Sequence, residues 1–317
     1  MVKLRAVPAT LLAFTFAHAG AQSLTPTVVA TSGASFQAGS VRLDATVGEP
    51  FNTVHEVNTV RLNEGFQQAE PVRLRLNARA FLQGPFNSGS GSMDDGLRNG
   101  GYLPLTEPYS ALGFVQHGSG GEHTSAAVLS VAGDDAVVDW VFLELRDAAD
   151  NTAVVASRNA LMQRDGDVVE TDGVSAVSFS APPAAYFLCV KHRNHLAVLT
   201  AATIPLSTST TAIDLTDGST STYGTGAQRV VGATRMSWSG DVNGDAAVRY
   251  TGSGNDRDPQ LLTVGGTTPN KVVAGYGTTD VNLDGYTKYT GPANDRDLIL
   301  QNVGGTTPNN VRPAQLP

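Results

Sequence analysis

The sequence predicts a mainly β protein, built on an antiparallel, immunoglobulin-like β-sandwich with a small C-terminal module of two repeats. Three observations predict this fold class. The chain contains 34 Gly and only 16% charged residues, a composition typical of strand-and-turn proteins. Between residues 72 and 206, short apolar and β-branched runs are separated by Gly and Asp-Gly turn signals. The last quarter of the chain contains a tandem repeat.

Seven runs in the central region are predicted to be strands, and almost no helical periodicity accompanies them. Alternation is clearest over 139–146, where Val141, Leu143 and Leu145 share one face, as in a half-buried strand. The single cysteine, Cys189, can form no internal disulfide and is interpreted as a buried core residue. The predicted strands span 72–81, 126–131, 136–146, 153–162, 167–171, 174–179 and 186–200.

The N-terminus has the pattern of a secretory signal peptide. Lys3 and Arg5 precede an uncharged run, and an Ala-x-Ala site follows at 17–19. The apolar run is shorter than the ~20 residues that span a bilayer. We therefore expect a secreted protein, extracellular or at the cell surface, with no transmembrane segment. The net charge of −8 argues against nucleic acid as a partner.

The remaining chain is expected to form four parts. Strand patterns at 28–30, 41–47 and 59–62 indicate an N-terminal β segment. The Ser, Thr and Gly content of 207–226 favours a linker or exposed loops between the sandwich and the repeats, and the linker is expected over 207–238. The expected organisation is a signal peptide (1–21), an N-terminal β segment (22–70), a β-sandwich domain (71–206), a linker (207–238) and two repeats (239–317).

Each repeat opens with three oxygen-bearing side chains on alternating residues, as in an EF-hand-like calcium loop. The second copy follows the first after 39 residues without a gap, and the carbonyl ligands would come from Ala247 and Tyr286. The twelfth loop positions are Gly, so a later carboxylate must close each loop. The predicted metal ligands are Asp241, Asn243 and Asp245 with Asp256 or Asp258, and Asp280, Asn282 and Asp284 with Asp295 or Asp297.

These residues predict two bound Ca²⁺ ions. Mg²⁺ is less favoured because it keeps several waters and takes few protein carboxylates. The alternative is a pair of solvated Asp, Asn and Gly turns that bind no ion.

The D-V-N-G-D opening at 241–245 resembles the duplicated calcium loops of dockerin modules. The resemblance implies a docking role, although the helix after each loop is expected to extend only about one turn before Gly-Gly. Other stretches resemble secreted, multidomain surface proteins of the Bacteroidota, which implies export and a surface setting. These stretches are 32–36, 46–50, 65–68, 139–141, 144–146, 164–169 and 192–196.

Three other groups of residues contain side chains that could form a site. His192 and His195 could bind a transition metal. On a strand they would point to opposite faces unless a bulge or turn intervenes, and polar residues that satisfy a strand end are favoured. The segment 117–123 contains Ser, Glu and two His but no known catalytic motif, which favours a mobile loop. A sugar-stacking platform, the alternative to core packing, would use Trp140, Trp238, Tyr102, Tyr109 and Tyr223.

The sequence thus favours an exported, calcium-binding, non-enzymatic protein of adhesion or assembly, with no catalytic residue assigned. Ca²⁺ would be one partner. The other would be a different protein, a second copy of the chain or a polysaccharide. The alternative is a secreted polysaccharide-binding or glycan-degradation accessory protein recruited through the dockerin-like repeats. An enzyme with an unrecognised site is the third hypothesis.

Overall fold

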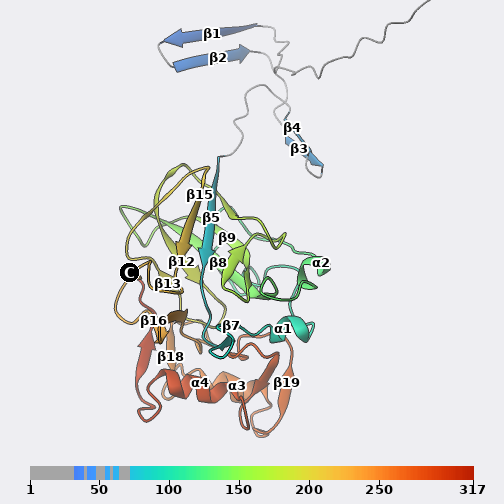
Figure 1. Ribbon diagram of the computed structural model, residues 1–317, viewed down its shortest axis with the longest axis vertical. Helices are drawn as coiled ribbons and strands as arrows, with labels where there is room; N and C mark the ends of the chain where they lie inside the picture. Colours follow the sequence, from blue (N-terminus) through green and yellow to red (C-terminus); the bar gives the residue numbers. More distant parts are fainter. Residues whose placement is uncertain (1–31, 39–40, 48–53, 58–59, 64–71) are drawn as a thin grey trace, which may run out of the picture. The chain divides into compact units, whose positions relative to one another are not determined.

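The computed structural model describes residues 32–38, 41–47, 54–57, 60–63 and 72–317 (Figure 1). The chain divides into two compact units, residues 1–70 and 71–317. The predicted signal peptide and the strand pattern at 28–30 lie outside the described residues. Among the described residues, no helix is long and apolar enough to cross a membrane.

The described residues of the first unit form two hairpins of antiparallel strands. β1 (Ser32–Ala38) pairs with β2 (Val41–Val47), and β3 (Val54–Val57) pairs with β4 (Val60–Asn63). The patterns at 41–47 and 59–62 therefore correspond to β2 and β4.

The second unit is mainly β, and its antiparallel sheets agree with the predicted fold class. Its main sheet has nine strands, in the order β11-β5-β10-β9-β8-β12-β13, with β14 beside β12 and β15 beside β5. Only β15 runs parallel to its neighbour. The strands are β5 (Arg73–Arg79), β8 (Val137–Asp147), β9 (Val154–Gln163), β10 (Asp167–Val169), β11 (Val177–Ser180), β12 (Ala184–Lys191), β13 (Val198–Leu199), β14 (Ile204–Leu206) and β15 (Thr210–Asp214).

Smaller elements complete this unit. The short pairs are β6 (Phe86–Asn87) with β7 (Ser92–Met93) and β16 (Gln228–Val231) with β17 (Thr234–Ser237). Two one-turn helices, α1 (Gly96–Asn99) and α2 (Ala126–Leu129), lie in the long connection between β7 and β8.

The central strand β8 is buried on both faces, so the half-buried pattern expected for it was wrong. The second face is covered by the β7–β8 connection, from which Tyr109 and Phe114 pack on Phe142 at ring distances of 5.5 and 5.3 Å. Cys189 is fully buried in β12, as predicted.

Two other local predictions were wrong for identifiable reasons. Residues 126–129 form α2 rather than a strand, because the Ser125 hydroxyl accepts a bond from the Val128 N–H and caps a helical turn. Segment 207–238 is not a linker. Its Thr-rich run forms β15, and the Gln228 amide donates to the carbonyl of buried Leu215 at 2.8 Å.

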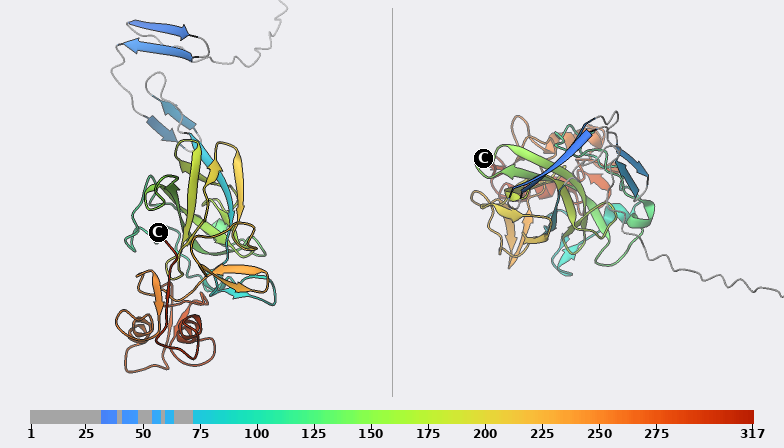
Figure 2. Two further views of the ribbon diagram at one scale, coloured as in Figure 1. Left: turned by 90° about the vertical axis from the view of Figure 1, so that its left-hand side faces the viewer. Right: turned by 90° about the horizontal axis from the view of Figure 1, so that it is seen from above.

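The repeats form the end of the unit at which two helices lie side by side (Figures 1 and 2). These are α3 (Arg257–Thr263) and α4 (Asp295–Asn302). Each extends about two turns, so the expected single turn was an underestimate. Small strands accompany them: β18 (Ala247–Arg249), β19 (Val272–Ala274), β20 (Tyr286–Lys288) and β21 (Val311–Pro313).

The two repeats complete each other. Strand β18 of the first loop pairs with β21, which follows the second helix, while β20 of the second loop pairs with β19. The Thr251 hydroxyl donates to Pro308 O at 3.0 Å, and the Thr290 hydroxyl donates to Pro269 O at 3.1 Å. Neither repeat therefore closes its own structure.

Candidate metal centre

Each acidic loop is shaped by its first carboxylate. Asp241 Oδ2 accepts from the Ala246 N–H at 3.1 Å, and Asp280 Oδ2 accepts from the Gly285 N–H at 2.9 Å. Both carboxylates are buried. Asp241 Oδ1 is buried and has no hydrogen-bond partner within the described part of the chain. This oxygen is available to a cation.

The tight turn requires left-handed backbone at the fourth and sixth loop positions. In the first loop these are Gly244 (φ 73°) and Ala246 (φ 64°), and in the second they are Leu283 (φ 59°) and Gly285 (φ 86°). Each copy thus places one non-glycine residue in the less favourable region. The same turn is kept in both loops although the glycine has changed position.

The loops are closed by Asp256 and Asp295, which were predicted alongside Asp258 and Asp297. Asp256 accepts from the N–H groups of Val242 and Arg249, both at 2.8 Å. Asp295 bonds the equivalent N–H groups of Val281 and Lys288, also at 2.8 Å. Both carboxylates are fully buried.

Asp258 and Asp297 serve the helix ends instead, so their assignment as loop-closing ligands is corrected. Each pairs with the preceding arginine and accepts from the amide of Asn255 or Asn294, at 2.9 Å in both repeats. Those Asn side chains accept from the N–H of Asp258 and Asp297 and cap the helices. About half of each carboxylate side chain is exposed.

Burial makes the four loop carboxylates resist ionisation. It raises the pKa of Asp241 to about 6 and that of Asp256 to about 7. In the second loop it raises the pKa of Asp280 to about 7 and that of Asp295 to about 8. Neighbouring carboxylates add to the effect, with Asp245 acting on Asp241 and Asp280 on Asp295. A bound cation would favour the ionised carboxylates and so oppose the rise in their pKa.

At the third and fifth loop positions, N–H groups and basic side chains already contact the oxygens that a cation would bind. Asn243 Oδ1 and Asn282 Oδ1 each accept a backbone N–H at 2.9 Å from the fifth loop residue. In the first loop that residue is Asp245, which forms an ion pair with Arg249. In the second loop it is Asp284, whose carboxylate lies 2.6 Å from the Lys288 ammonium group. In the part of the chain that is described, no three His, Cys, Asp or Glu side chains form a group placed to hold a metal ion. A cation would have to compete with Arg249 and Lys288 for its fifth-position ligands.

The donor chemistry nevertheless fits a hard cation. Every candidate ligand offers oxygen, and carboxylate, amide and carbonyl oxygens are the ligands of Ca²⁺. A route to each loop also exists. Asp241 and Asn243 line one cavity of about 660 Å³, and Asn282 and Asp284 line another of the same volume.

Asn194 was missed by the sequence analysis, although it joins both loops to the main sheet. Its carbonyl accepts from the N–H groups of Gly240 (2.9 Å) and Asp241 (3.1 Å). Its side-chain amide donates to the carbonyls of Thr278 (2.9 Å) and Asp280 (2.6 Å). The available signal was the polar run His-Arg-Asn-His directly after an apolar strand.

The residues around Asn194 form a buried polar network. His192 Nε2 lies 3.0 Å from Asp139 Oδ2, and Arg193 pairs with the same carboxylate. Arg193 also stacks on Tyr276 of the repeats, 4.2 Å from the ring centroid, and the Tyr276 hydroxyl donates to Asp139 at 2.7 Å. The network therefore joins β8 to the repeat module.

His192 and His195 lie in a turn after β12, not on a strand. Because this turn intervenes, the opposite faces expected for a continuous strand do not apply, and their Nδ1 atoms are 3.0 Å apart. Burial lowers the pKa of both imidazoles, that of His195 most strongly. His195 Nε2 accepts from the Gly84 N–H at 3.1 Å. Gly84 lies against the backbone of Val281, and His195 forms a β-bridge with Ser239, so the pair is part of the junction between sheet and repeats.

The other candidate sites do not assemble. In the 117–123 segment, the Ser119 hydroxyl bonds to Gln116 and Ser157 rather than to an imidazole. The proposed aromatic platform is not formed, because Trp140 and Tyr109 are fully buried in the core.

Comparisons with protein-family models, with curated proteins and with solved structures found no match to this chain.

Proposed function

We propose that this protein is an exported, calcium-binding β protein of adhesion or assembly, in which each acidic loop holds one Ca²⁺ ion. The observation that carries the calcium proposal is the pair of buried carboxylates in each loop, whose pKa values burial raises to between about 6 and about 8. The unpartnered Oδ1 of Asp241 adds a buried acceptor that a cation would satisfy. Export is proposed from the N-terminal sequence pattern.

The residues that would hold the first ion are Asp241, Asn243, Asp245 and Asp256, with the carbonyl of Ala247 as a further ligand. Asp280, Asn282, Asp284 and Asp295, with the carbonyl of Tyr286, would hold the second. This number of protein oxygens suits Ca²⁺ better than Mg²⁺.

Calcium would stabilise the attachment of the repeats to the sheet. Asn194 bonds the first residue of each loop, and the amides of Gln83 and Asn302 donate to each other across the same junction at 2.8 and 2.9 Å. Extracellular calcium modules bind in the range of about 0.1–1 mM. The protein would thus become rigid where calcium is abundant and present its surface to a partner or a second copy.

Calorimetric titration of calcium into the full, calcium-free chain tests the proposal. We expect two bound ions, and one ion in each of the single variants Asp245→Asn and Asp284→Asn. Those carboxylates are partly exposed, so the variants should still fold. The melting temperature should rise with calcium, because an ion that binds only the folded state stabilises it.

The matched control is Asp258→Asn with Asp297→Asn, because these helix-end carboxylates lie close in sequence but do not close the loops. It should keep two ions. Absence of binding heat at about ten times the expected range, or a stoichiometry unchanged by Asp245→Asn and Asp284→Asn, would leave the loops as ordinary turns.

A second candidate function is polysaccharide binding outside the cell. The observation that favours it is a cavity beside the second loop that is lined by both polar and apolar side chains, and binding of labelled polysaccharides to the intact protein would test it.

A further inference from the structure

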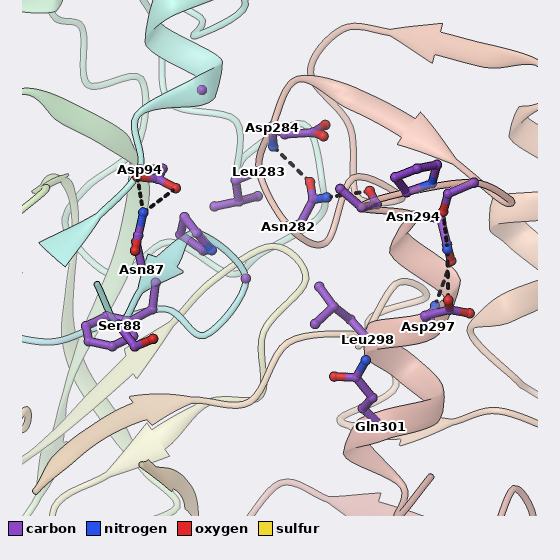
Figure 3. Close-up of a pocket in the computed structure, with 17 residues that line it drawn as sticks. Asn87, Ser88, Asp94, Asn282, Leu283, Asp284, Asn294, Asp297, Leu298 and Gln301 are labelled. Carbon is purple, nitrogen blue, oxygen red and sulfur yellow. Dashed lines mark hydrogen bonds between the residues drawn. The ribbon is translucent and has the colours of Figure 1, made fainter. Parts of the chain in front are cut away.

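A cavity of about 660 Å³ lies between the turn that carries β6 and β7 and the second repeat (Figure 3). One wall contains Asn87, Ser88 and Asp94. The other contains the loop residues Asn282 and Asp284 and, from α4 and its cap, Asn294, Asp297, Leu298 and Gln301. The volume is within the range of sites for small organic ligands.

The walls of this cavity are held together by close backbone approaches. A Cβ atom at Gly84 would collide with the carbonyl oxygen of Val281, and one at Gly96 would lie 2.8 Å from that of Leu283. The two walls can approach this closely only because both residues are glycine. The cavity is therefore a fixed feature of the folded unit, as expected of a preformed binding site.

Some polar groups in the cavity are engaged in holding its shape. The Asn282 amide donates to Ala293 O at 3.0 Å, and the Asn294 amide donates to Gly291 O at 2.7 Å. Other polar groups of the lining can still form hydrogen bonds to a ligand. The exposed Asp94 carboxylate receives only long bonds, of 3.3 and 3.4 Å, from Asn87. The side chains of Ser88 and Gln301 make no hydrogen bond to any described residue.

The charges of the lining exclude anions. No Lys, Arg or His is among the described residues that line the cavity. Asp284 is neutralised by Lys288 at 2.6 Å and Asp297 by Arg296 at 2.9 Å, which leaves Asp94 without an ion pair among the described residues. The Ca²⁺ ion proposed for the second loop would be offset by the carboxylates of Asp280, Asp284 and Asp295, so a phosphate, sulfate or uronate would meet the Asp94 carboxylate and no cationic side chain of the lining.

Apolar surfaces complete the lining. Pro85, Phe86, Pro292 and Leu298 contribute carbon surfaces beside the free carboxylate, hydroxyl and amide groups. A ligand that suits both needs hydroxyl groups that donate and accept hydrogen bonds, together with C–H faces that pack on apolar carbon. A neutral sugar has both.

We propose that this cavity binds a neutral saccharide, a short segment of a polysaccharide chain, through Asp94, Ser88 and Gln301. The proposal rests on the second candidate function and names its substrate class and site. Only the second repeat has this chemistry. The first repeat places Leu262, 73% exposed, at the position equivalent to Gln301, and Pro259 at that of Leu298.

The test is calorimetric titration of neutral cello-, xylo-, manno- and malto-oligosaccharides into the full chain in calcium. At least one should bind, and both Asp94→Ala and Gln301→Leu should weaken it by about tenfold, the effect of losing one hydrogen bond of about 1.4 kcal/mol. The controls are Asp217→Ala, which removes a remote exposed carboxylate, and Leu262→Gln in the first repeat. Both should bind as the unmodified protein does.

Three results would overturn the proposal: no binding by any of these sugars, binding unaffected by both cavity variants, or binding of uronate or sulfated oligosaccharides in their place. Calcium titration of the same samples distinguishes failure of the sugar proposal from failure of the calcium proposal. Sugar binding can be absent while both ions bind, and it can persist in a chain that binds none.

Discussion

Replacement of Asn194 by alanine should loosen the second loop while leaving the first in place. The Asn194 carbonyl, which bonds Gly240 and Asp241, remains in the variant, whereas the side-chain bonds to Thr278 and Asp280 are lost. Asn194 Oδ1 also lies 2.8 Å from His195 Nδ1, and that contact is lost as well. The substitution therefore separates two roles of one residue.

The magnitude follows from the groups left without partners. Asn194 is fully buried, and each buried polar group that loses its partner costs about 1–3 kcal/mol. The carbonyls of Thr278 and Asp280 lose this partner, whereas His195 Nδ1 keeps its contact with His192 Nδ1 at 3.0 Å. With two such groups, which relax together and do not add fully, we expect a loss of about 2–4 kcal/mol in the free energy of unfolding. Denaturation with urea, in parallel with the exposed control Asn310→Ala, measures it. The control should change stability by less than about 0.5 kcal/mol.

Hydrogen exchange tests where the loss falls. The Val281 amide, which donates to Asp295, should lose protection in Asn194→Ala. The Val242 amide, which donates to Asp256 in the same geometry, should keep most of its protection. Equal loss at both amides, or a total effect below about 1 kcal/mol, would refute the assignment of Asn194 as the connection to the second loop.

Three further predictions concern single buried groups. Because burial lowers the pKa of His192 and His195, stability that is present above their unfolded pKa of about 6.5 should be lost as pH falls below it. The buried loop carboxylates, whose pKa is raised, act in the opposite direction in the same range. The measurement is therefore the difference in urea midpoint between the unmodified protein and a His192→Gln, His195→Gln variant, which should shift against the unmodified protein as pH falls from about 8 to 5; a constant difference would contradict this. Burial raises the pKa of the Cys189 thiol to about 12, so a thiol reagent should modify it only after unfolding, and rapid labelling of the native protein would contradict its burial. Gln260 is buried with an unpartnered Oε1, where the second repeat has Ile299; Gln260→Ile should be neutral or stabilising by about 1 kcal/mol and Ile299→Gln destabilising by more than about 2 kcal/mol, as measured by urea unfolding.

The sequence predicted those elements whose signal is local. The apolar runs that became β5, β8, β9 and β12 could be recognised from their own composition, as could the acidic loops from their spacing. The errors arose where distant residues decide the outcome. The Thr-rich segment that forms β15 has no apolar face of its own and becomes a strand because β5 offers an open edge. The second buried face of β8 depends on Tyr109 and Phe114, which belong to an irregular connection.

The residues of the candidate site also fall into those that local sequence predicts and those that distant contacts decide. The positions of Asp241 and Asp280 follow from the repeat alone. The choice of Asp256 over Asp258 depends on which carboxylate reaches the N–H groups of Val242 and Arg249, and adjacent positions in one acidic run do not reveal that. The polar run around Asn194 marks the end of an apolar strand, but the role of Asn194 could not be assigned from it, because its partners lie more than 40 residues away in the repeats.

The reciprocal pairing of the repeats determines how the function of the module can be tested. Strands β18 and β20 each pair with the strand that follows the other helix, so removing one repeat leaves an unpaired edge on the other. Removing both would leave buried groups of the main unit, including the Gln83 amide and the Asn194 carbonyl, without partners. Loss of calcium or sugar binding after truncation would therefore report the loss of folding as well as the loss of the site. Asp284→Asn and Gln301→Leu change partly or fully exposed side chains within an intact unit, and for that reason they can assign each activity to its own residues.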